Sequence, residues 1–197
     1  MSAANPPHLA APRSDGDLVR RVLAGEREAF STLVIRHQAT LYRHARGMGL
    51  DAAAAQDLVQ DAFMKAYLRL RQCRDPERLL PWLLGVSRNL ALDWLRDVRR
   101  REEPLEAAGE APAQDGGPDR HEARDAVAGA LAGLPDILRE AFLLRHRLDC
   151  SYEEIAEITG ASLSAAKMRV VRAREALRAA LDAERAGDVT DGGGDPS

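Results

Sequence analysis

The sequence has few β-branched residues and no long hydrophobic run. Its 197 residues include 10 Val, 4 Ile and 4 Thr, against 35 Ala and 26 Leu. Alanine and leucine are strong helix formers, whereas β-branched residues favour strands, so this composition indicates an all-α protein. No apolar run approaches the ~20 residues that span a bilayer, so we expect no direct insertion into a membrane.

Cysteine is scarce, and the N-terminus has no apolar segment. Residues 1–15 contain prolines and one arginine but no hydrophobic stretch, so the sequence shows no signal peptide and indicates a cytoplasmic protein. Cys73 and Cys150 are the only cysteines and form no Cys-x-x-Cys motif. This usage is typical of incidental, reduced thiols, and a redox-sensing pair is the alternative.

The patterns of common catalytic and metal sites are also missing. The five histidines have no metal-ligand spacing to a cysteine or to each other, so zinc is not expected. There is no Gly-rich phosphate loop, no Gly-x-Ser-x-Gly and no His-Glu-x-x-His. We therefore expect a protein that acts by binding, with no catalytic residues, no metal and no cofactor.

The charge is small overall but unevenly distributed. The formal net charge is −3, yet residues 17–101 hold 16 basic and 10 acidic side chains. Residues 102–125 hold 8 acidic and 2 basic side chains, and residues 126–187 are balanced. A basic block, an acidic strip and a mixed block indicate two modules and a connector, the first of which can approach nucleic acid.

Proline and glycine mark the boundaries of these modules. Residues 102–120 contain three prolines and three glycines among acids, which predicts a flexible linker. Residues 1–16 and 188–197 have a similar composition, and we expect both ends to be disordered. The sequence thus predicts two small helical domains, over residues 17–101 and 121–187.

In the first domain, apolar residues at three- and four-residue spacing predict helices over about 26–46, 51–71 and 81–101. Asp51 is placed to cap the second helix, and Pro81 to open the third. The surface of the second helix that faces away from its apolar stripe carries Asp57, Gln60, Asp61, Met64 and Lys65.

In the second domain, the residues from Ser151 to about 184 predict a helix-turn-helix. Ser151 caps a short helix, with Glu154 in the capping-box position, and Gly160 supplies a left-handed turn. The following helix has a buried stripe through Leu163, Val170 and Leu177. Its outer face, which is suited to phosphates or base edges, carries Ser164, Ala165, Lys167, Met168, Val171, Arg172 and Glu175, with Arg174 at the side.

Two blocks of sequence together resemble a known family. The residues Asp57-Leu-Val-Gln-Asp-Ala-Phe-Met-Lys-Ala-Tyr67 and Trp82-Leu-Leu-Gly-Val-Ser-Arg-Asn-Leu-Ala-Leu-Asp-Trp-Leu-Arg96 resemble region 2 of extracytoplasmic-function (ECF) sigma factors, in the sigma-70 family of bacterial RNA polymerase sigma factors. Tyr152-Glu-Glu-Ile-Ala and Lys167-Met-Arg-Val-Val-Arg-Ala-Arg-Glu-Ala-Leu177 look like region 4. Both blocks stand in the order of the family, with an acidic linker between them.

The resemblance implies a function and a set of site residues. It implies that the chain binds core RNA polymerase, at the clamp coiled coil and the flap, and reads the minus-10 and minus-35 elements of promoter DNA. The clamp contacts would be Asp57, Gln60, Asp61 and Lys65. The minus-10 contacts would be Arg78, Trp82, Arg88, Asn89, Asp93, Arg96, Arg99 and Arg100. The minus-35 contacts would be Ser164, Lys167, Met168, Val171, Arg172 and Arg174. Family members are commonly held by an anti-sigma protein, so such a partner is also expected.

The sequence departs from the family pattern at two places. Residues 72–80 lack the aromatic residue that is common before the Trp-Leu pair, and Ser164-Ala-Ala stands where Gly-Thr-Val is frequent. These differences leave the fold intact, but they do not allow the promoter sequence to be predicted.

Two other functions compete with that of a sigma factor. A stand-alone helix-turn-helix regulator would leave residues 17–101 without a role. A helical adaptor that does not touch DNA would fit the net charge.

Overall fold

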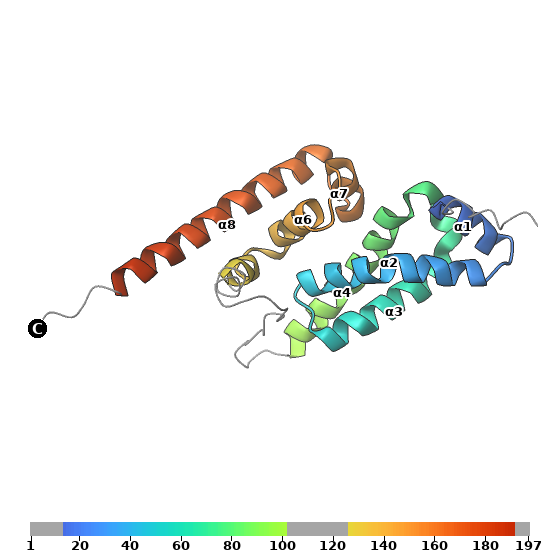
Figure 1. Cartoon of the computed structure of the whole chain (residues 1–197), viewed down its shortest axis with the longest axis horizontal. Helices are drawn as coiled ribbons and strands as arrows, with labels where there is room; N and C mark the ends of the chain where they lie inside the picture. Colours follow the sequence, from blue (N-terminus) through green and yellow to red (C-terminus); the bar gives the residue numbers. More distant parts are fainter. Residues whose placement is uncertain (1–13, 102–125, 192–197) are drawn as a thin grey trace, which may run out of the picture.

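The structure, a computed structural model, describes residues 14–101 and 126–191, in which all regular elements are helical (Figure 1). The first stretch contains α1 (Asp15–Leu23), α2 (Glu28–Gly47), α3 (Ala52–Arg69) and α4 (Leu79–Arg101). Two 3-10 turns, Leu70–Gln72 and Pro76–Arg78, connect α3 to α4. The second stretch contains a helix over residues 126–132, α6 (Asp136–His146), α7 (Tyr152–Thr159) and α8 (Leu163–Asp191). The predicted all-α class with two helical modules is confirmed.

The ends of the helices differ from the prediction at three places. α1 begins at Asp15, inside the segment 1–16 that we expected to be disordered, because Ser14 caps it by accepting a hydrogen bond from the Asp17 N–H at 3.1 Å. α8 continues to Asp191, past the predicted end near residue 184 and into the segment 188–197 that we also expected to be disordered. α4 begins at Leu79, so Pro81 lies within its first turn, where a missing N–H costs no hydrogen bond. The predicted linker 102–120 lies outside the described residues.

α1 was not predicted as a helix, although its sequence carries the signal. Leu18, Val19 and Val22 are buried at helical spacing and pack with α2. At the start of α1, the Asp15 carboxylate is 2.5 Å from Arg36 Nη1 and 2.8 Å from His37 Nε2 on α2. These contacts join α1 to the bundle of α2, α3 and α4.

The predicted cap of α3 and the predicted glycine turn before it are both present. The Asp51 carboxylate accepts a hydrogen bond from the Ala54 N–H at 2.8 Å and caps α3. The chain turns after α2 at Gly49, whose φ of 104° favours glycine.

Aromatic rings pack between α2 and α3. The Phe30 ring of α2 makes edge-on contacts with two rings of α3, and its centroid is 6.2 Å from that of Phe63 and 5.0 Å from that of Tyr67. These ring contacts hold α2 and α3 in fixed register.

The two modules pack against each other along one side of α4. α7 packs on α4, and α6 contacts α2. One continuous apolar core contains Leu83 and Leu84 of α4, Leu144 of α6, and Ile155 and Ile158 of α7. The C-terminal half of α8 extends away from this contact (Figure 1). In the described ranges, no helix combines the length and the hydropathy that a membrane crossing requires.

A histidine is buried without a hydrogen bond near this contact. His44 of α2 is only 1 % exposed, and neither of its ring nitrogens has a hydrogen-bond partner among the described residues. Burial, and secondarily the positive charge of Arg88, lower the pKa of His44 from 6.5 to about 4. The imidazole is therefore neutral at physiological pH.

We expect this histidine to destabilise the fold in mild acid. The unfolded chain binds a proton at His44 below its ordinary pKa, whereas the folded chain binds one only near the lowered value, so stability is full above about pH 6.5 and falls towards pH 4. The free energy of unfolding should fall by about 2 kcal/mol between about pH 7 and pH 5 from this group alone. Urea denaturation of the wild type and His44→Leu at both pH values isolates the effect, because the carboxylates are common to both. An equal loss in the two proteins would contradict the assignment.

Candidate nucleic-acid interface

The helix-turn-helix is built by local hydrogen bonds that the sequence encodes. Ser151 Oγ accepts from the Glu154 N–H at 3.1 Å, and the Glu154 carboxylate accepts from the Ser151 N–H at 2.7 Å. α7 ends at Gly160, whose φ of 64° lies in the left-handed region. Ser162 Oγ then accepts from the Ala165 N–H at 3.2 Å in the first turn of α8. The capping box and the glycine turn confirm the predicted motif and fix α8 relative to α7.

One face of α8 is buried and the other is presented to solvent. Ala166, Val170, Ala173 and Leu177 are buried, whereas Leu163, which we predicted in the buried stripe, is 39 % exposed. Leu163 is the first residue of α8, and the neighbouring Ser162 and Ser164 are exposed as well. The predicted outer residues are exposed on α8: Ser164, Lys167, Met168, Val171, Arg172 and Arg174.

The exposed face of α8 carries a cation beside an aromatic ring, Lys167, and an arginine without an ion pair among the described residues, Arg172. Lys167 Nζ lies 5.9 Å from the centroid of the Tyr152 ring, and Arg145 Cζ lies 5.0 Å from it. Within the described ranges, Arg172 forms no ion pair with a carboxylate. A helix that presents small residues, an exposed Met and such an Arg can enter a major groove and meet base edges.

The predicted minus-10 residues do not form one open face. Asn89 is exposed, and Asp93 and Arg96 are 3.1 Å apart in an exposed ion pair. Arg100 is also exposed, with its Nη1 3.9 Å from Asp97. Trp82 is partly buried against the core. The side chain of Arg99 lies outside the described residues.

Two predicted minus-10 cations instead contact the second module. Arg88 Nε is 2.6 Å from Glu140 Oε1 on α6, and Arg78 Nη2 is 3.0 Å from Glu157 Oε2 on α7. The Arg88 pair is buried, whereas the Arg78 pair is half exposed. Sequence reasoning could not find these pairs, because their partners are more than fifty positions away in the chain.

α3 presents a mixed polar and apolar surface. Asp57, Gln60, Asp61 and Lys65 are exposed, as the sequence predicted. Two apolar residues of the same surface were not among the predicted clamp contacts: Met64, which the sequence placed on this surface, and Leu68, which it did not. They are 64 % and 80 % exposed. Their signal is an apolar pair four residues apart that lies off the buried stripe. Exposed large apolar side chains beside charges are typical of a protein-binding surface.

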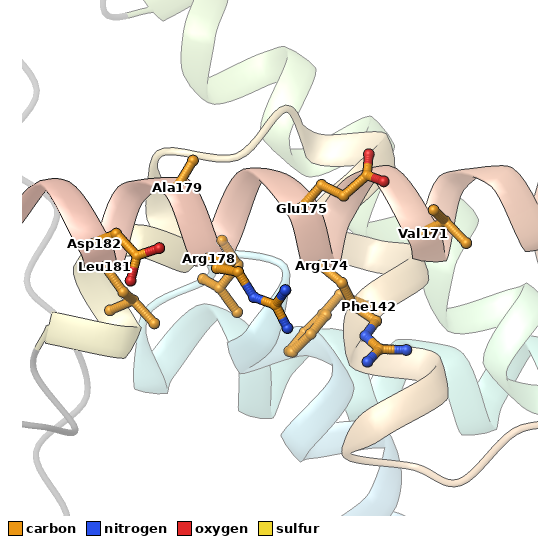
Figure 2. Close-up of a pocket in the computed structure, with 9 residues that line it drawn as sticks. Phe142, Val171, Arg174, Glu175, Arg178, Ala179, Leu181 and Asp182 are labelled. Atoms are coloured by element: carbon orange, nitrogen blue, oxygen red, sulfur yellow. The ribbon is translucent and has the colours of Figure 1, made fainter.

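A groove along α8 was not predicted from the sequence. It has a volume of about 720 Å³ and is lined by Phe142 of α6 and by Val171, Arg174, Glu175, Leu177, Arg178, Ala179, Leu181 and Asp182 of α8. Figure 2 shows Arg174 and Arg178 extending to the same side of α8 as the Phe142 ring. The groove forms because α8 is longer than α6. The apolar stripe of α8 therefore continues beyond the part of α8 that packs on α6.

The two cysteines are buried and unreactive at neutral pH. Burial raises the pKa of Cys150 to about 11, and the neighbouring Glu154 and Asp149 carboxylates add to the shift. Burial also raises the pKa of Cys73. A thiol that stays protonated is a poor nucleophile, so the structure favours the interpretation of both cysteines as incidental. Among the described residues, no cluster of His, Cys, Asp and Glu could hold a metal ion.

Family models match both modules. Residues 33–101 match the model of Sigma-70 region 2, and residues 124–177 match that of Sigma-70, region 4. The first match ends at the end of α4, and the second ends within α8. The exposed faces of α3, α4 and α8 therefore lie within the matched segments.

Several curated proteins are similar over most of this chain. It is 32% identical to the RNA polymerase sigma-H factor of Pseudomonas aeruginosa, over 85% of this chain and 93% of that protein. It is 32% identical to the ECF RNA polymerase sigma-E factor of Escherichia coli strain K12, over 83% of this chain and 92% of that protein. It is 35% identical to the probable RNA polymerase sigma factor RfaY of Xanthomonas campestris, over 79% of this chain, but spans only 41% of that longer protein.

Two solved structures have a similar fold. CnrH, solved in complex with the cytosolic domain of CnrY, is similar with a TM-score of 0.67 and 30% identity, over 87% of this chain and 99% of that one. The sigma factor RpoE from Bartonella quintana, solved with the anti-sigma factor NepR, is similar with a TM-score of 0.66 and 29% identity, over 78% of this chain and 96% of that one.

Proposed function

The chain belongs to the sigma-70 family and is an RNA polymerase sigma factor of the ECF type, and we propose how its exposed faces divide the work of promoter-specific initiation. The α3 surface docks on the clamp coiled coil of core RNA polymerase. The solvent side of α4 meets the minus-10 element, and the outer face of α8 reads the minus-35 element. The chain acts in the cytoplasm, where RNA polymerase works, and contributes binding rather than catalysis.

The observation that carries this proposal is the exposed face of α8. The face belongs to the second helix of a capped helix-turn-helix, whose opposite side is buried. Arg172 is exposed and can approach the acceptor edge of guanine, while Lys167 can approach a phosphate or a base edge. Met168 and Val171 lie between them and can contact the methyl group of thymine. These residues lie in the segment that matches region 4.

The groove beside Phe142 is suited to the flap of RNA polymerase. Its floor includes the apolar side chains of Phe142, Leu177 and Leu181, and its rim carries both charge signs. An amphipathic helix lays its apolar side into such a groove and pairs its charges at the rim. We assign this groove to the flap contact; it adjoins the DNA-reading face of α8 and shares Val171 and Arg174 with it.

An anti-sigma factor is a further partner in this proposal. Both solved relatives are complexes, and RpoE is bound to a protein named as an anti-sigma factor. The exposed Met64 and Leu68 on α3 and the apolar floor of the α8 groove are surfaces that such an inhibitor could cover. Covering either surface would block the polymerase contact proposed for it.

Transcription from genomic fragments tests the function on every promoter that the genome contains. Core RNA polymerase of the encoding organism is incubated with fragmented genomic DNA, with and without the chain, and the transcript starts are sequenced. We expect new starts that share one sequence motif near minus-10 and another near minus-35. If the chain binds no core polymerase and adds no starts, the proposal is wrong. Tight specific DNA binding by the chain alone would then favour a stand-alone regulator.

A further inference from the structure

α1 packs against the turn between α3 and α4 (Figure 1). This α3–α4 turn, residues 70–78, contains the two 3-10 turns and leads directly into α4. Leu18 of α1 is buried in the same apolar core as Leu70 and Cys73 of the turn. The turn therefore rests on α1 before the chain continues into the helix that we assign to the minus-10 element.

A carboxylate of this turn lies on the first residues of α1. Glu77 Oε1 accepts a hydrogen bond from Ser14 Oγ at 3.2 Å and is 3.5 Å from Arg20 Nη1. A Cβ atom placed on Gly16, which is buried, would lie 2.1 Å from Glu77 Oε1, and the two next nearest atoms belong to the same carboxyl group. The carboxylate thus occupies the space that a side chain at position 16 would fill.

The close fit and the Ser14 hydrogen bond matter more than the ion pair. The Arg20 and Glu77 side chains are 62 % and 53 % exposed, and an ion pair between such side chains adds little stability. Ser14 Oγ, in contrast, donates to Glu77 while it accepts from the Asp17 N–H, so one hydroxyl serves both the cap of α1 and this contact. A carboxylate is also favoured at the N-terminus of a helix. The contact therefore depends on the geometry of this end of α1.

Both sides of the contact are held in place. The Asp15 carboxylate ties the first turn of α1 to α2. Within the α3–α4 turn, the Asp75 carboxylate accepts from the Glu77 N–H at 3.2 Å, and the Asp75 carbonyl accepts from the Arg78 N–H at 3.0 Å. Arg78 is a predicted minus-10 contact, and α4 begins at the next residue. A displacement of Glu77 therefore moves residues that approach the DNA.

We propose that α1 positions the α3–α4 turn and the start of α4 for the minus-10 element, and that Glu77 is the positioning residue. This role rests on the proposed reading of the minus-10 element by α4. A segment that is already held in its binding conformation avoids the entropic cost of being ordered on DNA. Without the contact, only a fraction of the molecules has the competent conformation, and the apparent affinity falls with that fraction.

The sign of the effect distinguishes positioning from simple electrostatics. Glu77 is a negative charge beside residues that approach phosphates, so the removal of its charge alone would leave DNA affinity unchanged or raise it. A positioning role predicts the opposite, a loss of affinity when the contact is removed. Glu77→Gln lacks the charge but keeps an oxygen that can accept from Ser14 Oγ, so it should retain the affinity of the wild type.

Two variants remove the contact in different ways. Glu77→Ala removes the carboxylate. Gly16→Ala keeps Glu77 but places a methyl group where the carboxylate lies. Because alanine is more favourable than glycine in a helix, α1 itself should be at least as stable in this variant. Glu28→Ala removes one negative charge from an exposed site of α2 and is the control for the change of charge.

Two measurements follow the contact and its consequence. Hydrogen–deuterium exchange of the free full-length protein reports on the amides of Cys73 and Arg78, which donate hydrogen bonds inside the turn. DNA affinity is measured by titrating the reconstituted holoenzyme with a labelled single-stranded oligonucleotide that carries the minus-10 motif found by start-site mapping. Binding of each variant to core polymerase is measured in parallel.

We expect faster exchange in the turn for Glu77→Ala and Gly16→Ala. Their affinity for the oligonucleotide should be lower by roughly two- to tenfold, the factor that one net hydrogen bond is worth. Glu77→Gln and Glu28→Ala should match the wild type, and every variant should bind core polymerase normally. Unchanged exchange in both contact variants would overturn the contact. Faster exchange with unchanged or higher affinity would overturn the positioning role. Absence of start sites with the wild type would instead refute the proposed function, on which this role depends.

Discussion

Asp61→Arg is expected to abolish binding of core RNA polymerase while leaving the fold intact. Asp61 is exposed on α3, so its replacement disturbs no packing, and exposed substitutions of this kind usually change stability by less than about 0.5 kcal/mol. At the proposed interface, however, the charge reversal replaces an attraction by a like-charge contact, which costs several kcal/mol when desolvated. Co-purification with core polymerase and thermal unfolding measure the two effects separately.

The effect should be large because of what surrounds Asp61. Met64 and Leu68 are exposed apolar residues on the same helix surface, and their burial would exclude water from the charge. Glu28→Arg is the control, because Glu28 is an exposed carboxylate of the same module, at the first turn of α2. The control should keep polymerase binding and lose at most about 1 kcal/mol of stability from the helix dipole. Normal binding by Asp61→Arg would show that the docking surface lies elsewhere.

The sequence predicted those helices whose first or last residues are capping or turn-forming residues. Asp51, the pair Ser151 and Glu154, and Gly160 determine local hydrogen bonds that depend on neighbours within four residues. The outer face of α8 follows from helical periodicity, so its exposed residues could be predicted. α1 was missed because the expected disorder was carried to residue 16 and no helix was placed between residues 17 and 25, although Leu18, Val19 and Val22 form a short apolar stripe there.

The relation between the modules could not be predicted from the sequence. Arg88 and Glu140 are 52 positions apart and pair only because α6 packs beside α2 and α7 packs beside α4. A basic residue of a helix looks the same in the sequence whether it faces DNA or a buried carboxylate. The candidate minus-10 set therefore mixed solvent-facing residues such as Asn89 with residues that the second module covers.

Arg172→Ala is expected to change promoter selectivity as well as promoter strength. Arg172 is exposed on the outer face of α8, within the segment that matches region 4. If its guanidinium binds guanine in a bidentate manner, its loss costs ~1–3 kcal/mol at one base pair and relaxes the preference there. The measurement is transcription by the reconstituted holoenzyme from a library of promoters randomised across the minus-35 element.

Comparison with two other variants separates base readout from simple charge loss. Lys167→Ala removes a cation from the same face, and if Lys167 binds only phosphate, it should weaken all promoters alike and lower the salt dependence by about one counterion. Arg43→Ala removes the same charge from an exposed site on α2 and should change neither property. The discriminating quantity is the preference at each minus-35 position, since overall activity falls in both cases. If Arg172→Ala and Lys167→Ala both keep the wild-type preferences at every position, recognition of the minus-35 element does not reside on this face of α8.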